Sequence, residues 1–246
     1  MRVLVHGITG HMGQIIASLA ESGFAGATLA GGVSPDVQVE ENNNFKSFAT
    51  CNVESDVVVD FSFHGAVKDL LDYCISKNLP VVVATTGHTE EEKNLILEAS
   101  KKIPVFYSAN MSIGVATLAD LAKKAAAAFP DADIEIVETH HNRKIDVPSG
   151  TALLLANAIK EARPQSTFNI GRPENGKRTK EEIGIHSLRM GNIVGIHEIL
   201  ISTGNETITL KHEAHSRALF GEGALRAAAF LIGKKSGLYN MKDMIA

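Results

Sequence analysis

Residues 2–21 read RVLVHGITGHMGQIIASLAE, and this stretch decides the fold. Its first five residues form the apolar run of a buried strand, and apolar residues recur at helical spacing in its second half. Gly7, Gly10 and Gly13 separate the two patterns. Glycines at such spacing allow a tight turn from a strand into a helix. The stretch therefore predicts a strand, a glycine turn and a helix at the start of a βαβ unit.

The same alternation continues through the first half of the chain. Further strands are expected at 27–33, 57–61, 81–85 and 105–107, and helices at 66–77 and 90–102. Strands that alternate with helices indicate a parallel sheet, and nearly continuous apolar strands indicate helices on both of its faces. The fold class predicted is α/β, with an N-terminal Rossmann-like dinucleotide-binding domain over residues 1–109.

The pattern changes after Asn110. A helix is expected at 115–129, a strand at 134–138, a helix from Ser149, strands at 183–189, 193–201 and 206–212, and a last helix at 219–232. The three later strands have the two-residue period typical of antiparallel pairing. Residues 110–217 are therefore predicted to form an α+β domain for substrate binding and oligomerisation, and residues 218–246 to complete the first domain.

Composition and charge argue against several classes of protein. The formal net charge is -4, with the basic residues scattered along the sequence, so neither a nucleic acid nor an anionic membrane is an expected partner. No apolar run is long enough to span a membrane, and the N-terminus lacks a signal-peptide layout, so a cytoplasmic protein is expected. The two cysteines, Cys51 and Cys74, are not a C-x-x-C pair, and we expect no metal.

The glycine turn has a chemical as well as a structural interpretation. Such a turn brings backbone close to a pyrophosphate, whose charge then lies at the positive end of the helix. Thr9 stands where the usual G-x-G-x-x-G fingerprint has its second glycine, so plain strand–helix packing remains an alternative. After the second strand, Val33 and Ser34 are neither the carboxylate typical of NAD enzymes nor an Arg for NADP. Asp36 is either a ribose contact or a solvated turn residue, which leaves the cofactor preference open.

Residues 138–152, ETHHNRKIDVPSGTA, are the most informative for chemistry. Ser149 is a good helix N-cap, so the residues after it offer backbone N–H groups to a carboxylate. The loop before it carries two histidines and two cations, which are suited to hold an anion and to deliver a proton. A solvated basic loop ahead of an ordinary helix cap explains the same pattern equally well.

The segment 138–152 resembles the signature of the dihydrodipicolinate reductase family, written E-x-H-H-x-x-K-x-D-x-P-S-G-T-A. The resemblance covers nearly the whole chain. Similar motifs are Gly7-x-x-Gly10-x-Met12-Gly13, Asp60-Phe61-Ser62, Thr85-Thr86-Gly87, residues 109–115 (ANMSIGV), Arg189-x-Gly191-x-Ile193-Val194-Gly195-x-His197 and Gly237-Leu238-Tyr239-x-Met241.

This resemblance implies an activity and a set of site residues. The activity is reduction of an unsaturated cyclic imine dicarboxylate to tetrahydrodipicolinate by NADH or NADPH, on the diaminopimelate route to lysine. It implies His140 as a proton donor or acceptor, Lys144 as a proton donor, His141 as a substrate contact, and Gly150 and Thr151 as carboxylate ligands. The implied cofactor-binding residues are Gly7, Ile8, Thr9, Gly10, His11, Met12, Ala84, Thr85, Thr86, Ser108, Ala109, Asn110 and Met111.

The sequence departs from the family pattern at two positions. His11 replaces the usual Arg of the first turn, and Ala84 replaces the first glycine of a G-T-T-G loop. Both concern the cofactor's phosphate contacts rather than the proton donors. Arg217 matches a family position near the substrate, with a surface salt bridge as its alternative.

Three other functions fit parts of the pattern. One is a two-domain diaminopimelate or aspartate dehydrogenase, in which the block from His140 to Thr151 is not expected. The second is a dinucleotide-binding protein without turnover. The third is a metal site built from His140, His141, His212 and His215, for which no supporting Cys or H-E-x-x-H spacing exists. Because the antiparallel strands would leave an uncovered face or edge, we also expect a homo-oligomer, and the family resemblance implies a homotetramer.

Overall fold

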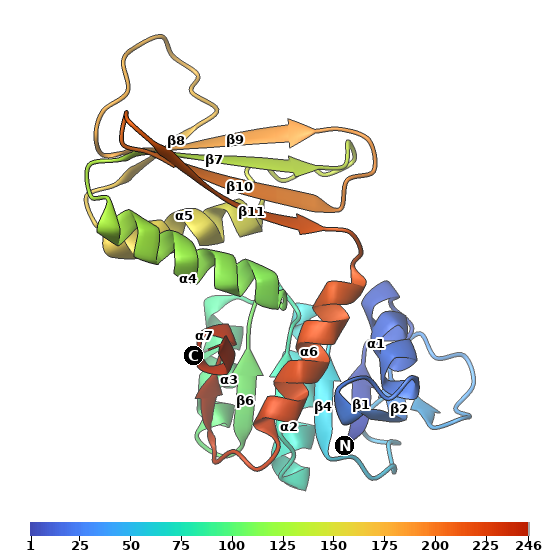
Figure 1. The fold of residues 1–246 in the computed structure, drawn as a ribbon. Coiled ribbons are helices and arrows are strands. Elements are labelled where there is room, and N and C mark those ends of the chain that lie inside the picture. The colour runs from blue at the N-terminus through green and yellow to red at the C-terminus, as the bar shows by residue number, and fades with distance from the viewer. Residues whose placement is uncertain (246) are drawn as a thin grey trace. The chain divides into compact units, whose positions relative to one another are not determined.

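The computed structural model describes residues 1–245, which divide into two compact units. The first unit contains Met1–Ser112 and the chain from Arg217 onward, and the second contains Ile113–Ser216. Figure 1 shows the helices and strands of both units. No helix among residues 1–245 is long and apolar enough to cross a membrane.

The first unit is built on a seven-stranded parallel sheet with the order β12-β6-β5-β4-β1-β2-β3. Its strands are β1 (Arg2–His6), β2 (Thr28–Val33), β3 (Asn44–Phe45), β4 (Val57–Asp60), β5 (Val81–Val83), β6 (Pro104–Tyr107) and β12 (Gly237–Tyr239). Its helices are α1 (His11–Glu21), α2 (Val67–Lys77), α3 (Glu90–Ser100), α6 (Ala218–Leu231) and α7 (Met241–Ile245), with 3-10 turns η1 (Phe24–Gly26) and η2 (His64–Ala66).

Both faces of this sheet are covered, as the apolar strands require. Side chains alternate between the faces, and Leu4, Val58 and Val81 join α2 and α3 in one core cluster. The helix α6 packs on β4, β5 and β6 and against α1 on the same sheet. The segment from residue 217 therefore completes the core of the N-terminal unit, although it comes last in the chain (Figure 1).

The second unit has a five-stranded sheet with the order β11-β10-β7-β9-β8. Its strands are β7 (Asp133–His140), β8 (Thr167–Ile170), β9 (Glu182–Arg189), β10 (Gly195–Ser202) and β11 (Thr207–Ala214), and its helices are α4 (Ile113–Ala128) and α5 (Gly150–Ala162). Both helices pack on one face of the sheet, where isoleucines of β7, β9 and β10 meet Leu118 and Leu155. We call this the helix face, and the opposite one the open face.

The α/β fold predicted from the sequence is confirmed, with one correction. The strands at 183–189, 193–201 and 206–212 were all expected to pair antiparallel. Strand β9 instead runs parallel to both β7 and β8, whereas β10 runs antiparallel to β7 and β11 as expected. A two-residue period shows that one face of a strand is buried, but it does not show the direction of the neighbouring strand. The short strands β3, β8 and β12 and the helix α7 were not predicted.

Candidate functional site

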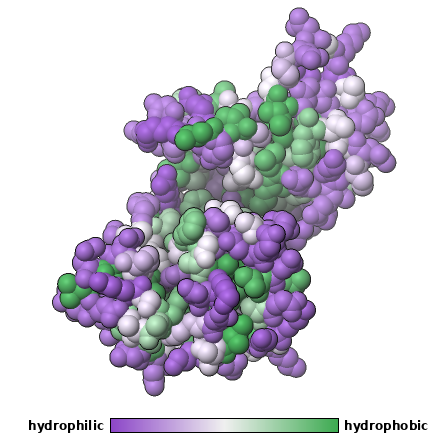
Figure 2. Space-filling view, turned by 180° about the vertical axis from the view of Figure 1, so that it is seen from behind, coloured by the Kyte–Doolittle hydropathy of each residue, from purple (hydrophilic) through white to green (hydrophobic). Residues whose placement is uncertain are grey.

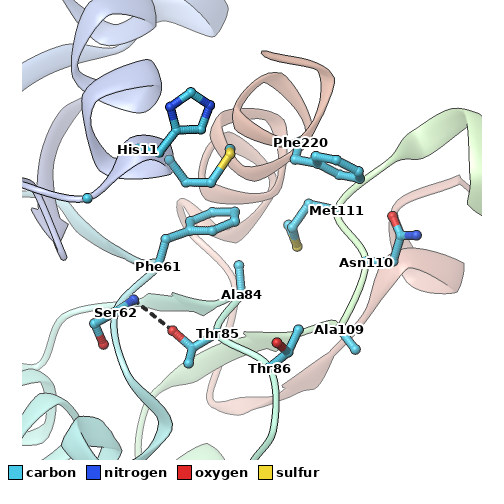
Figure 3. A pocket seen from close by; sticks show the side chains of 12 residues that line it. His11, Phe61, Ser62, Ala84, Thr85, Thr86, Ala109, Asn110, Met111 and Phe220 are labelled. Atoms are coloured by element: carbon cyan, nitrogen blue, oxygen red, sulfur yellow. Dashed lines mark hydrogen bonds between the residues drawn. The ribbon is translucent and has the colours of Figure 1, made fainter. Parts of the chain in front are cut away.

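The first unit contains a cavity of roughly 450 Å³ at the carboxyl ends of its parallel strands (Figure 3). This edge is where open α/β sheets bind ligands. Nine of the residues expected to bind the cofactor line it: Gly10, His11, Met12, Ala84, Thr85, Thr86, Ala109, Asn110 and Met111. Three loops that are distant in sequence therefore meet around one space.

The glycine turn beside this cavity has the close geometry that its sequence suggests. Gly7 has a φ of +85°, which favours glycine, and its N–H donates to the carbonyl of Val33 at 2.8 Å. A Cβ on Gly13 would lie only 2.1 Å from the carbonyl oxygen of Gly7. The turn can therefore pack closely against the start of α1. The N–H groups in the first turn of a helix have no acceptor within the helix. Such a helix terminus is suited to a pyrophosphate.

A buried polar group supports the loops beneath the cavity. Asp60 ends β4, where its Oδ1 lies 2.8 Å from Nδ1 of the buried His6 and accepts from the Ser62 hydroxyl at 2.6 Å. The Ser62 N–H in turn donates to the Thr85 hydroxyl oxygen at 2.8 Å (Figure 3). Two loops of the cavity are therefore held together by hydrogen bonds.

A second cavity of roughly 430 Å³ lies on the other side of the glycine turn. Ile8 and Thr9 line it, together with Asp36 and other residues of the loop after β2. The Thr9 and Ser34 hydroxyls lie 2.7 Å apart and join the two loops. The lining includes two carboxylates, Asp36 and Glu41, and no Lys or Arg.

The remaining residues of the expected cofactor set shape the backbone. Gly7 forms the turn, and the Ser108 hydroxyl donates to the Asn110 carbonyl at 2.7 Å. Neither lines either cavity. The first cavity also contains Phe61, Ser62 and Phe220, which were not in the expected set (Figure 3). The motif Asp60-Phe61-Ser62 pointed to two of them, whereas nothing in the sequence around Phe220 marks it as a site residue.

In the second unit, the expected carboxylate ligands lie at the start of α5. The Ser149 hydroxyl caps this helix by accepting from the Ala152 N–H at 3.2 Å. Gly150 and Thr151 form the first turn, where backbone N–H groups point toward an approaching anion. A Cβ on Gly150 would have no heavy atom within 4 Å, so the space beside this turn is open.

His140 ends β7 on the helix face and is held by a buried carboxylate. Its Nδ1 lies 2.5 Å from Oε2 of Glu138, which is fully buried. Arg189 donates to both oxygens of that carboxylate, at 2.8 and 2.9 Å. Burial by itself would raise the pKa of Glu138, but hydrogen bonds from His140 and Arg189 outweigh it and hold the pKa well below its usual range. Glu138 is therefore ionised, and His140 must donate from Nδ1.

A second imidazole lies beside His140. The rings of His140 and His197 are 5.1 Å apart and nearly perpendicular. Burial and the neighbouring His140 lower the pKa of His197 to about 3, so His197 is neutral. Its Nε2 lies 3.3 Å from the Ser149 hydroxyl oxygen. The Ser149 hydroxyl, which also accepts from the Ala152 N–H, therefore links His197 to the cap of α5.

The loop between His140 and Ser149 carries the expected cation. Lys144 Nζ lies 2.8 Å from Asp146 Oδ1, and the lysine side chain is 21% exposed. Arg189 donates to the carbonyl of Asp146 at 2.7 Å and so ties this loop to β9. His141 precedes the loop and accepts from the Lys144 N–H through its carbonyl at 3.1 Å. His140, Lys144 and the start of α5 therefore lie in one part of the unit.

Two further expectations concern His, Cys and Arg residues. Among residues 1–245, no group of His, Cys, Asp and Glu has the arrangement of a metal site. Cys51 and Cys74 are free and buried. Arg217 is exposed at the start of α6 and forms no ion pair with another described residue, so the alternative of a surface salt bridge is not seen.

Comparison with known proteins identifies the family. The family model for the N-terminus of dihydrodipicolinate reductase matches residues 1–111, and that for its C-terminus matches residues 114–245. A 4-hydroxy-tetrahydrodipicolinate reductase of Clostridium tetani is 47% identical, with 100% of this chain and 97% of that protein covered. One from Caldanaerobacter subterraneus subsp. tengcongensis is 44% identical, with 100% and 98% covered.

The fold is also that of a solved member of the family. The structure of a dipicolinate-bound dihydrodipicolinate reductase from Paenisporosarcina sp. TG-14 matches with a TM-score of 0.82 at 24% identity, covering 100% of this chain and 99% of that one. Two family models that together span almost the whole chain, and full-length relatives above 40% identity, lead to one conclusion. The chain belongs to the dihydrodipicolinate reductase family, oxidoreductases that reduce 4-hydroxy-tetrahydrodipicolinate in lysine biosynthesis.

Proposed function

We propose that this chain reduces 4-hydroxy-tetrahydrodipicolinate to tetrahydrodipicolinate with a nicotinamide cofactor, using proton donors and substrate ligands of residues 140–151. The observation that carries the proposal is the geometry of the second unit. There His140 is oriented by Glu138, beside a capped helix whose first turn is Gly150 and Thr151. An orienting carboxylate suits a proton-transfer group, and an open helix N-terminus suits a dicarboxylate substrate.

The residues of the first unit fit a nicotinamide dinucleotide. Because Gly7 and Gly13 carry no Cβ, the turn packs directly on the start of α1, where a pyrophosphate can approach the backbone N–H groups. The cavity beside it is bounded by Phe61, Met111 and Phe220, apolar side chains against which a nicotinamide ring can pack (Figure 3). We assign the dinucleotide to Gly7–Met12, Ala84–Thr86 and Ser108–Met111. When bound, the reduced nicotinamide supplies the hydride.

The chain's own residues then bind the substrate and move protons. The N–H groups of Gly150 and Thr151 hold one substrate carboxylate, and His141 contacts the substrate. Loss of the 4-hydroxyl group of the substrate as water leaves a conjugated ring. Hydride added to that ring would leave negative charge at its far end, which a positioned acid must neutralise. Lys144 donates that proton from Nζ, and His140 exchanges a proton at Nε2, because its Nδ1 is bound to Glu138. We also propose a cytoplasmic location for this biosynthetic enzyme.

The second cavity favours NADH over NADPH. The phosphate on the adenosine ribose of NADPH would approach Asp36 and Glu41 with no Lys or Arg in the lining, whereas the ribose hydroxyls of NADH can donate to a carboxylate. We expect kcat/KM to be at least about tenfold higher with NADH, which corresponds to roughly 1.4 kcal/mol. Asp36→Asn should narrow this ratio, while Asp72→Asn, in an exposed helical ion pair with Lys68, should leave it unchanged. A higher kcat/KM with NADPH would contradict the assignment.

The reaction is tested by a coupled assay. The unstable substrate is made in place from pyruvate and aspartate semialdehyde, and nicotinamide absorbance is followed with each cofactor. Oxidation of the cofactor that depends on both precursors supports the proposal. Binding of NADH without any oxidation would instead identify a dinucleotide-binding protein.

We also propose a homotetramer, on the basis of the open face of the second unit. Val137, Leu188, Ile196 and Leu200 point to this face and are half-buried or exposed, and neither α4 nor α5 covers them. Figure 2 shows that apolar side chains also reach the molecular surface. Burying them between copies removes apolar area from water. Light scattering coupled to size exclusion should give four times the mass of the 26.3 kDa chain, and a monomer would contradict this proposal.

A further inference from the structure

The carboxylate of Glu138 connects three parts of the second unit that the proposed reaction uses. Its Oε2 accepts from His140 Nδ1 and from Arg189 at 2.9 Å. Its Oε1 accepts from Arg189 at 2.8 Å and from the Ser149 N–H at 3.2 Å. Glu138 therefore contacts the proton-transfer histidine and the cap of α5 at once. Through Arg189, which also donates to the Asp146 carbonyl, it is linked to the loop of Lys144.

The free-energy cost of burying the Glu138 carboxylate indicates that this residue has a role beyond packing. A fully buried carboxylate is expensive unless every oxygen is paired, and here four donors from three elements converge on it. Because Arg189 already neutralises Glu138, the contact with His140 is not needed to balance charge. What that contact does determine is the ring's orientation and which nitrogen carries the proton.

The surroundings of His140 leave its other nitrogen available. Position 195 is a glycine, and a Cβ there would lie 3.1 Å from Nε2 of His140. Any side chain at 195 would therefore crowd this atom. The charged and titratable groups around the ring are Glu138 on β7, Arg189 on β9, His197 on β10 and Lys144 with Asp146 in the loop; His212 on β11 acts on His197. His197 is neutral, so Glu138 is the anion in direct contact with the ring.

We propose that Glu138, held by Arg189, is a positioning residue of the reductase: it keeps the His140 proton on Nδ1, turns Nε2 toward the substrate and stabilises the imidazolium formed when Nε2 takes up a proton. The inference rests on the proposed function, because it assigns His140 a role in proton exchange. It adds a residue pair, Glu138 and Arg189, which acts through His140 and does not touch the substrate.

The test is Glu138→Gln, which keeps the shape and removes the charge. We expect kcat to fall roughly 10²-fold, the lower end of what a positioned acid or base contributes, while the affinity for NADH stays unchanged. The limb of the pH profile that reports loss of a proton should move to lower pH, because a carboxylate beside an imidazolium is lost and Arg189 remains. Glu138→Asp should restore the position of that limb.

The chain offers a matched control on the same strand. Glu135 faces the open side of β7 and forms a similar cluster, with His186 Nε2 at 2.7 Å, Arg172 at 3.0 Å and a contact from Arg178. Glu135→Gln removes the same charge from a Glu–His–Arg cluster that lies away from Ser149 and Lys144. It should lower the unfolding temperature but leave kcat and the pH profile as in the wild type. An equal loss of kcat in both variants would overturn the proposal.

A readout that needs no turnover separates this inference from the proposed function. Long-range ¹H–¹⁵N spectra of the full chain should give His140 protonated on Nδ1 in the wild type and a changed tautomer in Glu138→Gln. If wild-type protein fails to reduce the substrate, the function fails whatever the tautomer. If it turns over and Glu138→Gln keeps both the pH profile and the tautomer, the positioning role fails. If Glu138→Gln does not fold, the proposal is tested with Glu138→Asp and with the spectrum of the wild type. A proton on Nε2 of His140 in the wild type would overturn the proposal.

Discussion

Replacing Lys144 with Ala should lower kcat by roughly 10²- to 10⁴-fold, the range that a positioned acid contributes. The reason is that Lys144 is the cation proposed to protonate the reduced ring, and Asp146 at 2.8 Å holds it in place. The dissociation constant for NADH should not change, because the dinucleotide is assigned to the loops of the first unit. Turnover is measured in the coupled assay, and binding is measured from the emission of NADH, which the absence of Trp from the chain keeps free of tryptophan background.

Two further variants define the role of Lys144. Lys144→Arg keeps the positive charge but cannot release a proton near neutral pH, so it should restore the KM for substrate but not kcat. Lys123→Ala removes an exposed lysine that pairs with Glu161 at 2.6 Å in the same unit, and it should behave as the wild type. Wild-type turnover by Lys144→Ala would contradict the proposed proton donor.

Replacing Gly13 with Ala should weaken the binding of NADH by at least about tenfold, or roughly 1.4 kcal/mol. Ala is the better helix former, so propensity alone would favour the substitution. The added Cβ, however, would lie 2.1 Å from the Gly7 oxygen and 2.8 Å from Ile8 Cα, both backbone atoms that cannot rotate away. The turn must therefore move from the start of α1, and the pyrophosphate site moves with it. NADH titration and thermal unfolding measure the two consequences.

Gly176→Ala is the matched control for this substitution. A Cβ at Gly176 has open space around it, and its φ is not positive. The same added methyl group should therefore change neither the affinity for NADH nor the unfolding temperature. Unchanged NADH binding by Gly13→Ala would show that the close approach of turn and helix is not part of the cofactor site.

Local elements whose sequence pattern is long or distinctive could be predicted from the sequence. The glycine turn, the helix that follows it and the Ser149 cap each depend on a few consecutive residues, and the structure has all three. Strands of two or three residues, such as β3 and β12, are too short to display a period. The parallel direction of β9 was missed because it depends on how the chain returns from α5, which no residue of β9 encodes.

Contacts between residues that are far apart in the sequence could not be predicted from the sequence. Phe220 lies in the same cavity as Met12 and Thr86, although it belongs to a helix more than a hundred residues later. Arg189 reaches the carboxylate of Glu138 from 51 positions away. Packing of α6 on β4, β5 and β6 brings Phe220 to the cavity, and pairing of β9 with β7 brings Arg189 to Glu138.

The sequence by itself determined the family, the α/β class and the segments that carry the chemistry, because motifs of adjacent residues encode turns, caps and sets of reactive groups. The tertiary structure alone decided that His140, Arg189 and Ser149 converge on Glu138, and that Asp36 joins Ile8 and Thr9 around a cavity. The physical reason is that hydrogen bonds and burial depend on distance in space. Strand pairing and helix packing set these distances, and many weak contacts along the whole chain determine both.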